Sequence, residues 1–196
     1  LTLGNYTRID AAGGDITIGG GADADSNLRP DGPIVSSTDD GIGLGTSAIA
    51  NGVIIKSYDA TVPSAIKMGD ISIRGKTTFS NNAASGIEYH PGLQVSGATV
   101  FMKGEIANSV TADNTASGIW SSAIATPATT IATLIESYAS YSAKTASIQI
   151  IGETNSTYPL LMGNYGPITI AARGDLSDVY YSGATTATTA TRGAFL

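Results

Sequence analysis

Short stretches in which apolar residues alternate with other residues recur along the chain and predict β-strands. In seven of them, apolar residues stand four and two positions before a closing Gly, Ser or Ala. Since side chains along a strand point alternately to its two faces, each apolar pair predicts one buried face. Thirteen of the fourteen paired positions are apolar, and Thr133 is the exception. The closing residues are Gly20, Ser57, Gly75, Gly104, Ser137, Gly152 and Ala172.

The spacing of these strands favours a stacked, repetitive fold. Intervals between closing residues range from 15 to 37 residues, and the 3.6-residue period of a helical repeat is absent. A constant strand signature at irregular intervals predicts an all-β parallel β-helix (β-solenoid) whose irregular loop insertions extend outward. We expect the seven strands to lie over one another and to fill the interior with Ile and Val, including Ile18, Ile73, Ile150 and Ile170. The interval of 15 residues between Ser137 and Gly152 is short for a full coil, and the alternative for these two strands is that they form neighbouring sides of one turn.

Further repetition supports a single domain. Gly-Ile pairs at Gly41, Gly86 and Gly118 each follow a polar loop and open a second short strand. The segment 71–77 resembles 148–154, which lies 77 residues later, and 53–60 resembles 133–140. We therefore predict a β-solenoid over 1–176. The Thr- and Ala-rich segment 177–196 is predicted to be a terminal strand or linker.

Composition limits the classes of function. Charged residues make up 13% of the 196 residues and the net charge is −6, which argues against nucleic acid or anionic membrane as partner. Cysteine is absent, and no apolar run approaches the roughly 20 residues of a membrane span, so membrane insertion is not expected. The sequence begins with Leu1, and we expect a processed product or a piece of a longer chain.

Residues at outward positions predict the surface chemistry. If the seven strands form one stack, Lys56, Arg74 and Lys103 form a basic ladder that ends at Glu136, or simply a solvated face. The neighbouring outward column contains Ile54, Phe101 and Leu134, which are too apolar to be left in water as a group. We expect either a folded-back loop or another chain to cover them.

No arrangement of residues in the sequence defines a catalytic site. His90 is the sole histidine and stands beside Pro91, and no G-x-S-x-G motif is present, so we interpret His90 as a turn residue. The sequence does not fix any distance between carboxylates, which a glycoside hydrolase needs at defined separations. Candidate carboxylates are Asp39, Asp40, Glu88, Glu105, Glu136 and Glu153, and aromatic residues that could stack on sugars or pack against loops are Tyr58, Tyr89, Trp120, Tyr138 and Tyr141.

One acidic loop offers candidate calcium ligands. Residues 23–27 match the opening of an EF-hand loop, D-x-D-x-N, but Leu28 and Ile34 stand where Gly and Glu are needed. An EF-hand is therefore excluded. A looser calcium site would use Asp23, Asp25 and Asp31, and the alternative is a solvated loop. We expect no other metal or cofactor.

The succession of GDITI or GDISI, a polar loop, Gly-Ile and a further strand resembles the repeats of filamentous-haemagglutinin-type proteins, the large adhesins of two-partner secretion. The resemblance covers roughly residues 14–175, in the motifs at 14–18, 41–42, 69–75, 86–87 and 118–119. It implies a right-handed parallel β-helix on the cell surface that serves as stalk and contact surface. The chain is far shorter than such an adhesin and lacks the secretion domain.

These observations predict an extracellular, non-catalytic structural or adhesive β-solenoid module of a cell-surface protein. Its expected partners are a cell-surface receptor or glycan, or copies of itself in a homo-oligomer or filament. One alternative is a self-assembling extracellular filament subunit. The other is a phage tail-spike protein that binds or cleaves carbohydrate.

Overall fold

The computed structural model describes residues 1–22, 31–57, 68–79, 84–107, 117–122, 131–138, 147–154, 160–161, 167–173, 178–185 and 194–195. Its regular elements are all strands, and no helix occurs among the described residues. The strands form three sheets in which every strand pair is parallel. The predicted all-β class is therefore confirmed.

The three sheets are called A, B and C here. Sheet A contains β1 (Thr2–Leu3), β5 (Ile42–Leu44), β8 (Ile87–Tyr89), β11 (Ile119–Ser121), β14 (Leu160–Leu161) and β17 (Ala194–Phe195). Sheet B contains β2 (Thr7–Asp10), β6 (Val53–Lys56), β9 (Leu93–Gly97), β12 (Thr133–Tyr138) and β15 (Ile168–Arg173). Sheet C contains β3 (Ile16–Ile18), β4 (Ile34–Ser36), β7 (Ile71–Thr77), β10 (Thr99–Ile106), β13 (Ser147–Thr154) and β16 (Asp178–Thr185).

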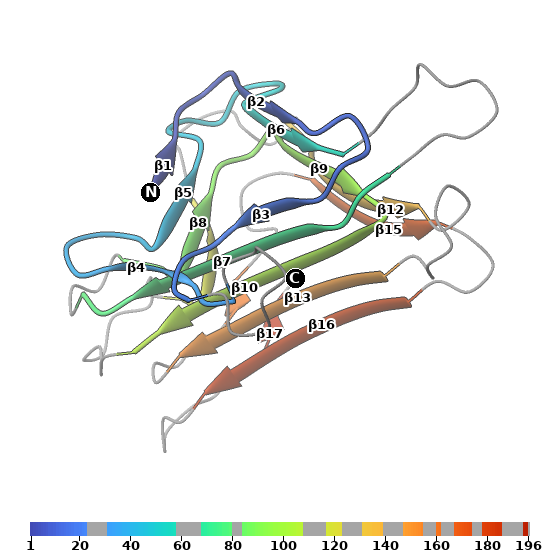
Figure 1. The fold of residues 1–196 in the computed structure, drawn as a ribbon. Helices are drawn as coiled ribbons and strands as arrows, with labels where there is room; N and C mark the ends of the chain where they lie inside the picture. Colours follow the sequence, from blue (N-terminus) through green and yellow to red (C-terminus); the bar gives the residue numbers. More distant parts are fainter. Residues whose placement is uncertain are drawn as a thin grey trace, which may run out of the picture.

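The chain visits the sheets in the constant order A, B, C (Figure 1). The one departure is β4, which follows β3 and also pairs with β7 of sheet C. Within each sheet, neighbouring strands are those that follow one another at successive visits. Each strand therefore lies beside the strand of the previous visit, with two other strands between them in sequence, or three where β4 intervenes.

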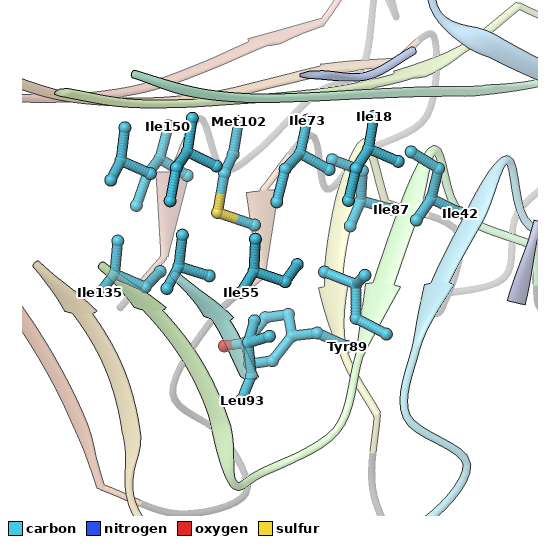
Figure 2. Packing of buried hydrophobic residues seen from close by; sticks show 14 of the residues in the cluster. Ile18, Ile42, Ile55, Ile73, Ile87, Tyr89, Leu93, Met102, Ile135 and Ile150 are labelled. Atoms are coloured by element: carbon cyan, nitrogen blue, oxygen red, sulfur yellow. The ribbon is translucent and has the colours of Figure 1, made fainter. Parts of the chain in front are cut away.

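Residues stack in register into buried aliphatic columns. In sheet C, Met102 lies opposite Ile73 on one side and Ile150 on the other. All three side chains are fully buried, and Figure 2 shows them in one row with Ile18. Ile55 and Ile135 of sheet B belong to the same cluster, so the sheets share one core.

The prediction that all seven strands form one stack was wrong. Strands 16–18, 71–75, 100–104 and 148–152 lie in sheet C, whereas 53–57, 133–137 and 168–172 lie in sheet B. Ile170 therefore belongs to sheet B, where it packs half-buried against the shared cluster, and not to the column of Ile73. The two sheets have the same sequence signature because strands of both approach a corner of the fold that demands a small residue.

Three of the glycines that the pattern predicts to close strands of sheet C, Gly75, Gly104 and Gly152, lie inside those strands. Strand β7 continues to Thr77 and β10 to Ile106, so the strands run two residues further than predicted. A Cβ atom on Gly75 would overlap the carbonyl oxygen of Gly86, and one on Gly104 would overlap that of Gly118. Glycine is needed here because the backbone of sheet A crosses against the inner side of sheet C.

The corner between sheets B and C also requires a small residue. Ser57 is fully buried after β6; its hydroxyl donates to the Gly14 carbonyl oxygen (2.5 Å) and accepts from the Gly69 amide (2.7 Å). At the next visit the corresponding residue is Gly97, where a Cβ would lie 2.9 Å from the Ile71 side chain. The small residues therefore allow the backbone of one sheet to pass close to the next.

An insertion separates β3 from β4 in the first visit to sheet C. Gly20 forms an antiparallel bridge with Gly32, so the chain leaves the sheet at Gly20 and returns as β4. Ile34 then lies opposite Gly75 in β7. Gly20 was expected to close a strand, and instead it begins an excursion from the sheet.

The structure gives the internal repeats a spatial meaning. Segments 71–77 and 148–154 are β7 and β13, which flank β10 in register in sheet C. β6 and β12 likewise flank β9 in sheet B. The segment 178–185 forms β16, paired with β13, while the division into 1–176 and 177–196 stays a prediction.

Candidate functional site

Three ionisable side chains gather where the chain enters sheet A. Asp40 directly precedes the Gly-Ile pair of β5, and Glu88 lies in β8 opposite Gly43. Asp40 and Glu88 share a side-chain hydrogen bond, and Asp40 Oδ1 also accepts the Ser85 backbone N–H at 2.5 Å.

The pair is arranged to share a proton. Burial of the Asp40 carboxyl, its hydrogen bond to Glu88 and the charge of Glu88 together raise the pKa of Asp40 to about 8. The Ser85 N–H favours the ionised form, and the Asp39 charge opposes it. Two carboxylates at hydrogen-bond distance in a half-buried position cannot both be charged without strong repulsion, so one of them holds the proton at neutral pH.

His90 extends this cluster. Its side chain is 11% exposed, and its Nε2 atom lies 4.0 Å from Glu88 Oε1. The Nδ1 atom is buried without a hydrogen-bond partner. Burial lowers the pKa of His90, although the nearby Glu88 charge opposes this. His90 is therefore neutral at pH 7.

The geometry argues against glycoside hydrolysis by this pair. A retaining enzyme needs carboxyl groups about 5 Å apart and an inverting enzyme about 6.5–9.5 Å apart. Carboxyl groups that hydrogen-bond directly leave no space between them for a sugar or a water. Trp120 lies beside Glu88 in sheet A and is half-buried, whereas Tyr89 is buried in the core and cannot stack on a ligand.

The other carboxylate pair noted in the sequence is neutralised by lysines. Glu105 and Glu153 lie opposite each other in sheet C, and Lys103 Nζ lies 3.0 Å from a carboxylate oxygen of each. Lys76 adds a further contact to Glu105 at 3.3 Å. Although burial acts to raise the pKa of Glu105, these lysines outweigh it and hold that pKa below its usual value. Glu105 is therefore ionised at neutral pH and cannot act as a general acid there.

The Glu136 carboxylate on sheet B is likewise paired with a cationic side chain. Its carboxylate accepts hydrogen bonds from the Arg173 guanidinium and from the Tyr138 hydroxyl, the latter at 2.7 Å. The guanidinium also lies 5.9 Å from the centre of the Tyr138 ring. Tyr138 is therefore held by a charged network.

The predicted basic ladder is wrong. Arg74 and Lys103 are neighbours in sheet C, but Lys56 lies in sheet B, where Ser96 separates it from Glu136. Lys56 pairs instead with Asp10 at 3.0 Å. The prediction failed because it placed strands of two sheets in one stack.

The predicted apolar column of Ile54, Phe101 and Leu134 is also wrong, because its residues lie in two different sheets. Phe101 lies in sheet C, where the Arg74 guanidinium stacks at 5.0 Å from its ring centre. Ile54 and Leu134 lie in sheet B with Gln94 between them. The three residues therefore form no continuous patch.

Two of the three predicted calcium ligands, Asp23 and Asp25, lie outside the described residues. The third, Asp31, is described, and its backbone carbonyl oxygen accepts a hydrogen bond from the Arg74 guanidinium. No group of three or more His, Asp or Glu able to hold a metal occurs among the described residues. The calcium site stays a prediction.

The pairing of Asp40 with Glu88 was missed because no distance between carboxylates was assigned. A signal was present, since Gly41-Ile42 and Gly86-Ile87 were seen as equivalent strand starts. Placing these starts side by side puts Asp40 against Ser85 and Glu88 against Gly43.

The fold places the chain in the class of all-β proteins built from parallel sheets. No family model, curated protein or solved structure matches the chain. The resemblance to filamentous-haemagglutinin-type repeats therefore stays a prediction. In the part of the chain that the structure describes, no helix is long and apolar enough to cross a membrane.

Proposed function

We propose that the three sheets are the faces of a parallel β-solenoid with an irregular insertion in its first coil. The cyclic order of sheets, the in-register pairing and the single aliphatic cluster support this proposal. One passage through sheets A, B and C forms one coil. Each coil buries its aliphatic residues against the coils before and after it, so stability accumulates with neighbours.

The function that follows is that of an extracellular, non-catalytic structural or adhesive module of a cell-surface protein. A stack held by axial hydrogen bonds and a continuous core is stiff and can hold surface groups away from a support. The single observation that carries this proposal is the uninterrupted parallel stacking over one core. The charges on the outer faces support it further, because lysine or arginine neutralises Asp10, Glu105, Glu136 and Glu153, and Asp40 is paired with Glu88.

Binding and turnover measurements test the two halves of this proposal. The purified chain, coupled to beads, is expected to bind cells or at least one class of glycan on an array, and to release no reducing ends from a panel of polysaccharides. Arg74→Ala serves as a control for charge-driven binding, because Arg74 is the cation over Phe101 on the outer face of sheet C. Release of reducing ends that disappears in Glu88→Gln would contradict the non-catalytic role.

Self-assembly into a filament is a second proposal, since edge strands of stacked sheets can pair with further strands. Strand β16 offers eight residues that pair only with β13 among the described strands. Sedimentation velocity over a hundredfold concentration range measures this. A species that grows with concentration is expected for a filament subunit, and a constant monomer contradicts it.

A further inference from the structure

Among the described residues, three corners at which sheet C leads into sheet A can be compared in full, and they differ in one chemical respect. Gly41, Gly86 and Gly118 each open a strand of sheet A, and Ser85 and Ser117 precede the second and third of these glycines. Asp40 precedes the first. Backbone pairing continues through all three corners: the Gly41 N–H donates to the Ser85 carbonyl oxygen at 3.0 Å, and the Gly86 N–H donates to that of Ser117 at 3.4 Å.

The two serines show what this position normally holds. Ser85 and Ser117 are fully buried, and neither hydroxyl has a hydrogen-bond partner. A small neutral side chain is therefore sufficient for the corner. Asp40 instead accepts the Ser85 N–H and reaches Glu88, which belongs to the next strand of the sheet. The carboxyl thus adds a side-chain link between β5 and β8 that the other corners do not need.

We propose that Asp40 and Glu88 form a proton-dependent clasp that holds the start of β5 against β8 while they share a proton and loosens it when the proton is lost. The clasp does not depend on any adhesive role of the chain. It makes the stability of one place in the stack depend on pH. Loss of the proton leaves two adjacent carboxylates, whose repulsion acts directly across the β5–β8 pairing.

The charged and titratable groups around the clasp set the direction of its response. Asp39 precedes it on the same segment, His90 follows Glu88 on β8, and the Leu1 nitrogen donates to the Gly41 carbonyl oxygen at 3.0 Å. Sheet C contributes Lys76, whose ammonium is paired with Glu105. On β11 the facing residue is the neutral Trp120. Since Lys76 is engaged elsewhere, Asp39 and Glu88 oppose ionisation of Asp40.

The sign of the effect follows from the protons bound. A carboxyl with a pKa of about 8 in the folded chain and about 4 in the unfolded chain binds more protons when folded between these values. Its contribution therefore favours folding at low pH and is lost as pH rises toward 8. Histidine acts in the opposite direction at lower pH, because the lowered pKa of His90 disfavours its protonation in the folded chain. Loosening at alkaline pH is thus assigned to the carboxyl pair.

Amide hydrogen exchange tests the clasp at its own position. After correction for intrinsic rates, the Gly41 and Ile42 amides of the full chain are expected to lose at least tenfold in protection between pH 6 and pH 9.5. The Gly86 and Ile87 amides at the second corner provide an internal control and should keep their relative protection. An equal pH response at both corners, or none at either, would overturn the proposal.

Asp40→Ser gives the first corner the residue that the other two corners have. This variant is expected to fold and to lose the additional pH response of Gly41 and Ile42, while Asp39→Ser, at the exposed neighbouring carboxylate, is expected to keep it. Carboxyl-carbon NMR of the folded wild type adds a readout that does not depend on variants. Titration of one carboxyl near pH 8 supports the shared proton, and titration of every carboxyl below pH 6 refutes it.

Discussion

The first C-to-A corner and the two that follow share a backbone but differ in one side chain. At all three, glycine allows the chain of sheet A to pass against sheet C, and a Cβ on Gly41, Gly86 or Gly118 would collide with backbone atoms. The residue before the glycine is Asp40 in the first corner and a buried serine in the others. Backbone crowding therefore requires glycine at the corner, whereas the preceding position accepts either a serine or an aspartate side chain.

The largest expected effect comes from filling the crowded position. Gly104→Val should prevent folding or cost more than about 4 kcal/mol, because its Cβ would overlap the Gly118 carbonyl oxygen and backbone atoms cannot move aside cheaply. Urea unfolding measures the loss. Gly43→Ala is the matched control, since its Cβ would lie 3.4 Å from the flexible Thr2 side chain. Equal stability of the two variants would contradict the crowding argument.

Removing a side chain from the core is expected to reduce the free energy of unfolding by somewhat less than Gly104→Val does. Met102 is fully buried between Ile73 and Ile150, so Met102→Ala should destabilise the chain by about 2–5 kcal/mol through lost burial and a cavity. Thermal unfolding followed by circular dichroism measures this. Gln149→Ala, at an exposed position of the neighbouring strand, should stay within about 0.5 kcal/mol of wild type. A small effect of Met102→Ala would mean that the columns do not form the core.

Moving the carboxyl to the second corner sharpens the comparison. Ser85→Asp should destabilise the chain by about 1–3 kcal/mol at pH 8 and by less at pH 5, because the new carboxyl is buried and its charge is repelled by Asp40, whose Oδ1 accepts the N–H of residue 85. Urea unfolding at the two pH values measures the difference. Ser85→Asn is the control, because asparagine has nearly the same size as aspartate and carries no charge. A penalty independent of pH would attribute the effect to volume.

The smallest effect is expected on the outer face of sheet C. Lys103→Met should cost about 0–1 kcal/mol at pH 7 although Lys103 contacts two glutamates, because the pairs are partly exposed. The pKa of Glu105 is held below its usual value, so the stability it provides is present above about pH 4.5 and is lost as pH falls through the folded value. Urea unfolding at pH 7 and pH 3 should show the difference between variant and wild type shrinking. A cost above about 3 kcal/mol would contradict this interpretation.

The strand positions and the inward residues of sheet C could be predicted from alternation alone. Ile71, Ile73, Val100 and Met102 are buried as expected, because β-branched and long apolar residues at every second position define one buried face. The equivalence of 71–77 and 148–154 also corresponded to real neighbours. Local pattern is sufficient where a strand has one buried side.

The assignment of strands to sheets could not be predicted in the same way. Ser57 and Gly75 occupy similar positions in the pattern, yet Ser57 lies at the B-to-C corner, whereas Gly75 lies inside β7, where the start of sheet A passes against it. Both positions require a small residue, so the pattern does not distinguish them. The same ambiguity placed Lys56 with Arg74 and left Asp40 and Glu88 unpaired. Long-range register, which local sequence does not encode, decides these contacts.

A distance across sheet C tests the stacked arrangement most directly. Because the chain has no cysteine, spin labels can be placed at Thr17→Cys in β3 and Tyr180→Cys in β16 without other changes. These positions lie in one column separated by four strand spacings, so pulsed electron spin resonance should give a narrow distribution near about 19 Å, allowing for label length. A distribution centred beyond about 35 Å, or without a defined maximum, would contradict the stack.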